Sequence, residues 1–138
     1  MKRKDVLNII YQTLVENGNY VKFESEDKLV YGAVENHVKS IVLLDKNELG
    51  FKMSLRVGSF SSESSIETVL RGCELINKDC HLAKITLENI DGLYVLYVNI
   101  EYVCYNKRDL VKFITYAEMY LYIASIKTIE FLDNNITR

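Results

Sequence analysis

The sequence predicts an α+β domain with the element order α-ββββ-α-ββ-α, in which an antiparallel sheet carries its helices on one face. Three observations predict this fold class. Hydrophobic residues recur with the period of a helix in residues 2–16, 65–77 and 107–132, and with a period of two in the segments between them. The breaks between the first four strands are short and polar, which is typical of antiparallel neighbours. A chain of 138 residues, 49% of them hydrophobic, can bury a single core, so we expect residues 1–138 to form one domain.

The first helix is predicted for residues 2–16, because its hydrophobic side chains fall on one side of the helical wheel. These side chains are Val6, Leu7, Ile10, Tyr11 and Leu14. Asn17-Gly18 follows, and both residue types tolerate the left-handed conformation in which many helices end. We therefore expect the helix to end at this pair.

Four strands are predicted between Tyr20 and Val57, in the stretches YVKFES, KLVYGAV, HVKSIVLLD and GFKMSLRV. In the fourth strand, alternation separates hydrophobic from polar side chains. The hydrophobic face consists of Phe51, Met53, Leu55 and Val57. The polar face, expected to point toward water, consists of Lys52, Ser54 and Arg56. This pattern indicates a sheet with one buried face.

A second helix is predicted after the serine cluster, with Ser64 as its N-cap and Glu67 in the capping-box spacing. Its core-facing stripe consists of Ile66, Val69, Leu70, Cys73, Ile76 and Asn77. Asn77 is polar on this apolar stripe and stands where helix turns into strand. We predict that its side chain caps backbone groups at that junction.

A hairpin and a third helix complete the predicted order. The stretch LAKITLE, a turn at residues 89–92 and the long alternating strand LYVLYVNIEYV form the hairpin. Asn106, with Asp109 three residues later, is predicted to cap a final helix that runs to about Leu132.

The final helix is hydrophobic on two sides. The side assigned to the sheet consists of Leu110, Phe113, Ile114, Ala117, Leu121, Ala124, Phe131 and Leu132. The opposite side, where polar residues are expected, carries Tyr116, Met119, Tyr122, Ile123 and Ile126. Soluble monomers rarely expose large apolar patches, so we hypothesise that this second side forms a homodimer or partner interface. The alternative is that the first helix and the loops of the chain itself cover it.

Composition narrows the class of partner. The net charge is −2 and the basic residues are scattered among acids, so we expect no nucleic-acid partner. Residues 113–132 approach the length of a membrane span but include Glu118, Lys127 and Glu130, so we expect no membrane insertion. The N-terminal residues lack the cleavage site of a signal peptide, and the number of cysteines is odd. These features predict a cytoplasmic protein with reduced thiols.

The stretch CELINKDCHLAKI concentrates the residues that could carry chemistry. Cys73 and Cys80 lack the short ligand spacing of structural zinc sites, and Cys80 and His81 are neighbours whose side chains point to opposite sides of an extended segment. Cys73 lies at the centre of the core-facing stripe and is predicted to be a buried apolar residue. We expect no catalytic residue, metal or cofactor. The alternative is a small thiol- or metal-dependent enzyme that uses Cys80 and His81, with Cys104 as a further candidate.

The segment from residue 66 to residue 103 resembles a known family. Ile76-Asn77 closes the second helix, Leu82-Ala83-Lys84 opens a strand, and Asp91-Gly92 precedes a long alternating strand. With the element order, these features resemble the YbjN-like family, whose domains share the fold of type III secretion chaperones. The resemblance implies a type III secretion chaperone-like fold. This chain has four predicted strands before the second helix, where the secretion chaperones typically have three.

The resemblance also implies a function. Members of the family look like non-enzymatic, often dimeric, acidic cytoplasmic proteins, and the secretion chaperones hold an extended segment of a partner along apolar surface. We therefore expect a non-enzymatic protein-binding module, a dimeric chaperone-like or regulatory adaptor that holds a partner protein segment. The alternatives are the thiol or metal enzyme described above and a structural subunit of a larger complex.

Overall fold

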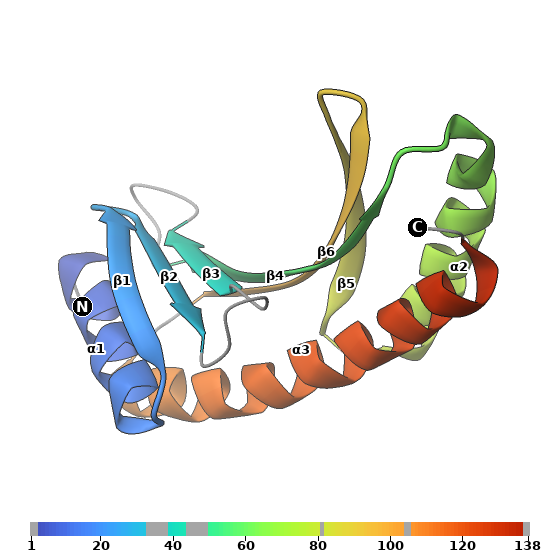
Figure 1. Ribbon diagram of the computed structural model, residues 1–138. Coiled ribbons are helices and arrows are strands. Elements are labelled where there is room, and N and C mark those ends of the chain that lie inside the picture. The colour runs from blue at the N-terminus through green and yellow to red at the C-terminus, as the bar shows by residue number, and fades with distance from the viewer. Residues whose placement is uncertain (1–2, 33–38, 44–49, 81, 104–105, 137–138) are drawn as a thin grey trace.

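The computed structural model describes residues 3–32, 39–43, 50–80, 82–103 and 106–136. In chain order these residues form α1 (Arg3–Glu16), β1 (Tyr20–Ser25), β2 (Lys28–Gly32), β3 (Lys39–Leu43), β4 (Gly50–Phe60), the 3-10 turn η1 (Glu63–Ser65), α2 (Ile66–Asp79), β5 (Lys84–Ile90), β6 (Leu93–Val103) and α3 (Lys107–Asn135) (Figure 1). The predicted α+β order of helices and strands is confirmed, with a short 3-10 turn added before α2.

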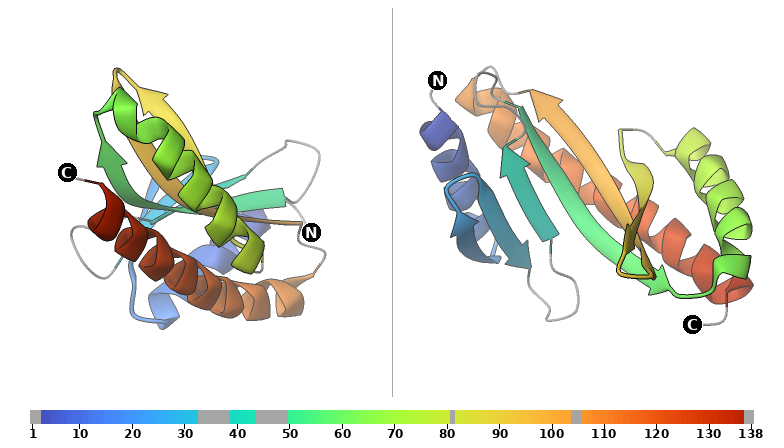
Figure 2. Two further views of the ribbon diagram at one scale, coloured as in Figure 1. Left: turned by 90° about the vertical axis from the view of Figure 1, so that its right-hand side faces the viewer. Right: turned by 90° about the horizontal axis from the view of Figure 1, so that it is seen from above.

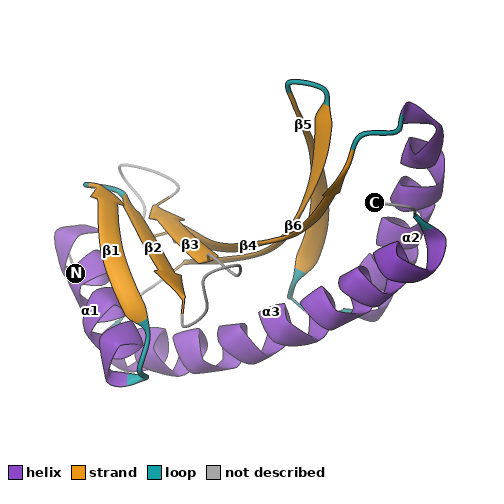
Figure 3. Ribbon diagram, in the orientation of Figure 1, coloured by secondary structure: helices purple, strands orange, loops and turns teal. Residues whose placement is uncertain are grey.

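The described strands form one antiparallel sheet of six strands in the order β1-β2-β3-β4-β6-β5. The long strands β4 and β6 pair from Gly50 opposite Val103 to Phe60 opposite Tyr94, with a bulge between Arg56 and Gly58. Figures 1 and 2 show α3 running along one side of this sheet, with α1 and α2 near its two ends. Within the described residues, no helix lies on the other side of the sheet, here called its open side (Figure 3).

The side of the sheet that faces the helices shares one hydrophobic core with them. In β4, Phe51 and Met53 point into this core, opposite Tyr102 and Ile100 of β6. The ring of Phe113 from α3 stacks on Tyr102, with 3.9 Å between the ring centroids. The largest side chains that are almost completely buried are Phe51, Ile10, Leu14, Leu29, Met53, Leu96, Ile100, Leu110, Ile114, Leu121 and Leu132.

Two turns have the backbone conformations that their residues predict. Gly18, after α1, has a φ of +86°, and Asp91 and Gly92, between β5 and β6, have φ values of +51° and +85°. Glycine adopts this left-handed region without steric cost. The strand β5 begins at Lys84, two residues later than predicted, because Leu82 is itself left-handed with a φ of +64°.

The predicted N-cap of α2 is wrong. Ser64 lies inside η1, and the N-cap residue is Ser65, whose side chain makes no capping hydrogen bond. A capping box needs an extended N-cap residue, whereas Ser65 already has helical backbone angles because the 3-10 turn leads into α2. The hydroxyl of Ser64 pairs with that of Ser62 instead, at 2.7 Å.

Two residues differ from the prediction in how deeply they are buried. Leu70, assigned to the core, is half exposed, and Gly72 is buried in its place because the ring of Phe131 from α3 lies over it. Ser54, assigned to water, is buried, and its hydroxyl donates a hydrogen bond to Asn99 Oδ1 of β6 at 2.7 Å. Both differences come from neighbouring elements that a single helix or strand pattern does not include.

The start of α3 agrees with the prediction. Asn106 is its N-cap residue, and the Asn106 side chain accepts a hydrogen bond from the backbone N–H of Asp109 at 3.0 Å. The helix continues to Asn135, slightly beyond the predicted end near Leu132. Among the described residues, none of the helices combines the length and the hydrophobicity needed to cross a membrane.

Candidate functional site

Helix α3 is the longest element of the described chain and spans the whole width of the sheet (Figure 1). Its inner side is buried against the core. The buried residues of this helix are Leu110, Ile114, Ala117, Leu121, Ala124, Ser125, Thr128 and Leu132. These buried residues anchor the helix to the core along most of its length.

The outer side of α3 exposes the five hydrophobic residues predicted from the sequence. The exposed fractions of these residues lie between 37% and 66%. These residues, here called the outer face of α3, are Tyr116, Met119, Tyr122, Ile123 and Ile126. The alternative prediction, in which the chain's own first helix and loops cover this face, is wrong for the described structure, since all five side chains are exposed.

The charge of Glu118, in the middle of α3, is directed away from the outer face. The hydroxyl of Tyr31 on β2 donates a hydrogen bond to Glu118 Oε1, and both groups are at least partly buried. Burial, followed by the charge of Glu118 and this hydrogen bond, raises the pKa of Tyr31 well above its ordinary value. Residues 113–126 are all described, and within them Thr115 is the only exposed residue that does not belong to the outer face. An uncharged apolar strip therefore lies between Lys112 and Lys127.

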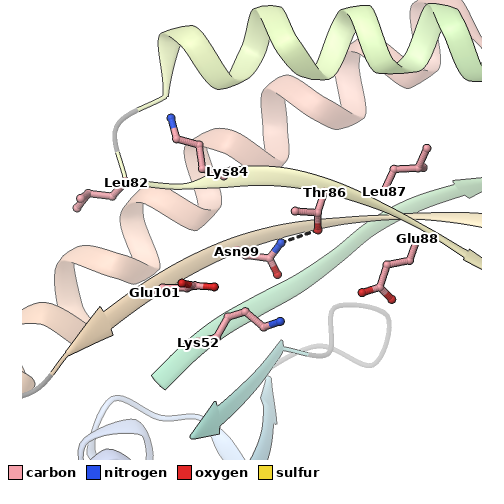
Figure 4. A pocket seen from close by; sticks show the side chains of 8 residues that line it. All are labelled: Lys52, Leu82, Lys84, Thr86, Leu87, Glu88, Asn99 and Glu101. Carbon is pink, nitrogen blue, oxygen red and sulfur yellow. Dashed lines mark hydrogen bonds between the residues drawn. The ribbon is translucent and has the colours of Figure 1, made fainter. Parts of the chain in front are cut away.

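The open side of the sheet carries a hollow of about 580 Å³ (Figure 4). It is lined by Lys52, Leu82, Lys84, Thr86, Leu87, Glu88, Asn99 and Glu101. Two hydrogen bonds in series connect side chains at the floor of the hollow. Asn99 Oδ1 accepts one from the Ser54 hydroxyl, and Asn99 Nδ2 donates the other to Thr86 Oγ1 at 2.7 Å. The prediction missed this hollow. The polar residues that alternate along β5 and β6 are visible in the sequence. That they line one hollow together with Lys52 of β4 depends on the order of the strands in the sheet.

The surroundings of Cys73 favour a structural role for its thiol. Cys73 and Cys80 are both free and buried. The burial of Cys73 agrees with its predicted place on the core-facing stripe of the second helix. Burial raises the pKa of the Cys73 thiol to about 11, so this thiol is protonated at neutral pH and is a weak nucleophile. His81 and Cys104, named as candidates with Cys80, lie outside the described residues.

Asn77 connects the end of α2 to the start of β5. Its Oδ1 accepts a hydrogen bond from the backbone N–H of Ile85 at 2.7 Å, and its Nδ2 donates one to the Ile85 carbonyl at 3.3 Å. Lys84 Nζ donates to the carbonyls of Asn77 and Cys80, at 2.9 Å and 3.3 Å. These contacts satisfy backbone groups that the helix end and the strand edge leave open.

Comparison with known proteins supports the fold. Neither the family models nor the curated proteins searched contain a match to the sequence. Among solved structures, the crystal structure of YbjN from E. coli, a proposed transcription regulator, superposes with a TM-score of 0.68. The match covers 90% of this chain and 89% of YbjN, at 19% sequence identity. The chain has the YbjN-like fold. The predicted resemblance is thus confirmed at the level of the fold, over a larger part of the chain than residues 66–103.

Proposed function

We propose that this chain is a non-enzymatic protein-binding module of the cytoplasm, a dimeric chaperone-like or regulatory adaptor that holds a segment of a partner protein. The observation that carries the proposal is the outer face of α3, which exposes hydrophobic side chains and carries no charged residue between Lys112 and Lys127. Contiguous apolar patches of this kind mark interaction sites on soluble proteins. The net charge of −2 favours a protein over a nucleic acid as the partner.

Two further observations support the proposal. YbjN, which shares the fold, is a proposed transcription regulator, and a regulator acts by contact with other macromolecules. The hollow on the open side of the sheet lies away from α3. Its lining includes lysine and glutamate side chains, the side-chain amide of Asn99 and the hydroxyl of Thr86. Groups of this kind suit an extended polypeptide, whose own polar groups are donors and acceptors in alternation. The dimer contact and the partner segment can therefore occupy opposite sides of the domain.

The test of the proposed function compares three forms of the protein. Ile123→Asp places a charge in the outer face of α3, and Leu75→Asp places the same charge on an exposed leucine of α2 as the control. Light scattering at micromolar concentration should give twice the chain mass for the wild type and for Leu75→Asp, and the chain mass for Ile123→Asp. Affinity capture from cells that produce the protein should then recover a partner with the wild type. A monomeric wild type that captures nothing would count against a binding module.

A further inference from the structure

The outer face of α3 has an internal symmetry. Taking 100 degrees per residue, Tyr116, Met119, Ile123 and Ile126 all lie within about 40 degrees of the direction opposite the buried Leu121. Their spacings are three, four and three residues, which is the spacing of the a and d positions of a coiled coil. We call these four residues the seam.

The two ends of the seam carry opposite charges. Lys112 precedes it and Glu130 follows it, both on the same side of the helix, and both are exposed. Each lies nine residues from Leu121, just as Met119 and Ile123 each lie two residues from it. A twofold rotation about an axis that passes through Leu121 and is perpendicular to α3 therefore exchanges the position of Lys112 with that of Glu130. The same rotation exchanges Met119 with Ile123, so hydrophobic positions coincide with hydrophobic positions.

We propose that a second copy of this chain occupies the outer face of α3, with the two α3 helices antiparallel and related by a twofold axis at Leu121. In this arrangement Met119 lies against Ile123 of the second copy, and Lys112 lies against its Glu130. A twofold interface requires such self-complementarity, because each contact between two positions occurs twice. Parallel packing would instead place Lys112 against a second Lys112 and Glu130 against a second Glu130. The inference rests on the dimeric module proposed above and specifies its geometry.

Charge reversal tests this geometry. Lys112→Glu and Glu130→Lys each turn both end pairs from attractive to repulsive, and should each raise the dimer dissociation constant about tenfold at low salt. The double variant restores both pairs and should dimerise like the wild type. An equimolar mixture of the two single variants should form heterodimers, because one chain is then acidic and the other basic at both seam ends. Analytical ultracentrifugation across a concentration series measures each constant.

The outcomes separate this inference from the proposed function. Recovery in both the double variant and the mixture supports the antiparallel seam, and loss of these differences at high salt supports their electrostatic origin. If the wild type dimerises but the single variants dimerise equally well, or if the double variant is weaker than either, the antiparallel geometry is wrong and the binding module stands. If the wild type is a monomer at all concentrations, the second copy is not the occupant. Capture of a partner that Ile123→Asp abolishes would then assign the outer face to that partner.

Discussion

Asn77 and Ile85 exchange two hydrogen bonds, one from the Ile85 N–H to Asn77 Oδ1 and one from Asn77 Nδ2 to the Ile85 carbonyl. The side-chain amide thereby takes the place that a neighbouring strand would fill. Because β5 is at the edge of the sheet and β6 is its partner strand, these groups of Ile85 face away from the sheet. Asn77 therefore both joins α2 to the sheet and occupies part of an edge that would otherwise be open to strand addition.

Removal of this amide should destabilise the fold. We expect Asn77→Ala to lower the free energy of unfolding by about 1–3 kcal/mol, because it leaves two partly buried backbone groups without this partner. Urea unfolding followed by circular dichroism measures the change. Lys78→Ala is the matched control, since Lys78 is the next residue and its side chain is exposed; it should change stability by less than about 0.5 kcal/mol. Equal losses for the two variants would show that the Asn77 hydrogen bonds contribute little.

Cys73 should resist modification in the native state. Its buried thiol, with a pKa raised to about 11, is largely protonated at pH 8. We expect iodoacetamide to leave Cys73 unmodified in the folded protein and to alkylate it within the same time in urea, as read by peptide mass spectrometry. The comparison of the two conditions serves as the control. Rapid native alkylation would contradict a purely structural role for Cys73.

The sequence was sufficient for features that depend on neighbours along the chain. The Asn106 cap, the left-handed Gly18 and the burial of Cys73 are all set within one or two turns of backbone, and the outer face of α3 follows from one helical period. Contacts between residues on different strands and helices could not be predicted from the sequence. Ser54 and Asn99 are 45 residues apart, and Tyr31 and Glu118 are 87 apart. No local period indicates that these side chains meet.

Gly72 should be intolerant of a side chain. A methyl group at this position would overlap the ring of Phe131, which lies directly over the glycine. Alanine favours a helix over glycine by about 1 kcal/mol, but overpacking costs about 1–3 kcal/mol, so we expect Gly72→Ala to destabilise the protein by up to about 2 kcal/mol. Thermal unfolding measures the loss.

The double variant Gly72→Ala with Phe131→Leu identifies the cause of that loss. If the ring is the obstacle, the double variant should be more stable than the sum of the two single changes predicts, because the smaller side chain relieves the overlap. Strictly additive losses would point to a backbone effect of the alanine instead. Leu75→Ala, on the exposed side of the same helix, controls for general changes in α2.

The Tyr31–Glu118 hydrogen bond explains why a charged residue is tolerated in the middle of α3. Tyr31 is almost completely buried in β2, and its hydroxyl donates to the Glu118 carboxylate. Tyr31→Phe removes one hydrogen bond to a carboxylate, so we expect it to lower the free energy of unfolding by about 1.5–3 kcal/mol at pH 7. Urea unfolding measures the change. Tyr20→Phe, which alters a largely exposed tyrosine of β1, should leave stability within about 0.5 kcal/mol of the wild type.

The same pair predicts how stability depends on alkaline pH. Burial and the nearby Glu118 charge raise the pKa of Tyr31 in the folded state well above the ordinary value of 10.0. Folding therefore favours the neutral phenol. The stabilisation is fully present below pH 10 and is lost as the pH rises from 10 toward the folded-state pKa, at a slope of up to about 1.4 kcal/mol per pH unit. Urea unfolding at pH 8 to 12 should show a shallower alkaline loss for Tyr31→Phe than for the wild type, whereas Tyr20→Phe should follow the wild type. Parallel curves for all three proteins would mean that Tyr31 ionises in the folded state as readily as in the unfolded chain.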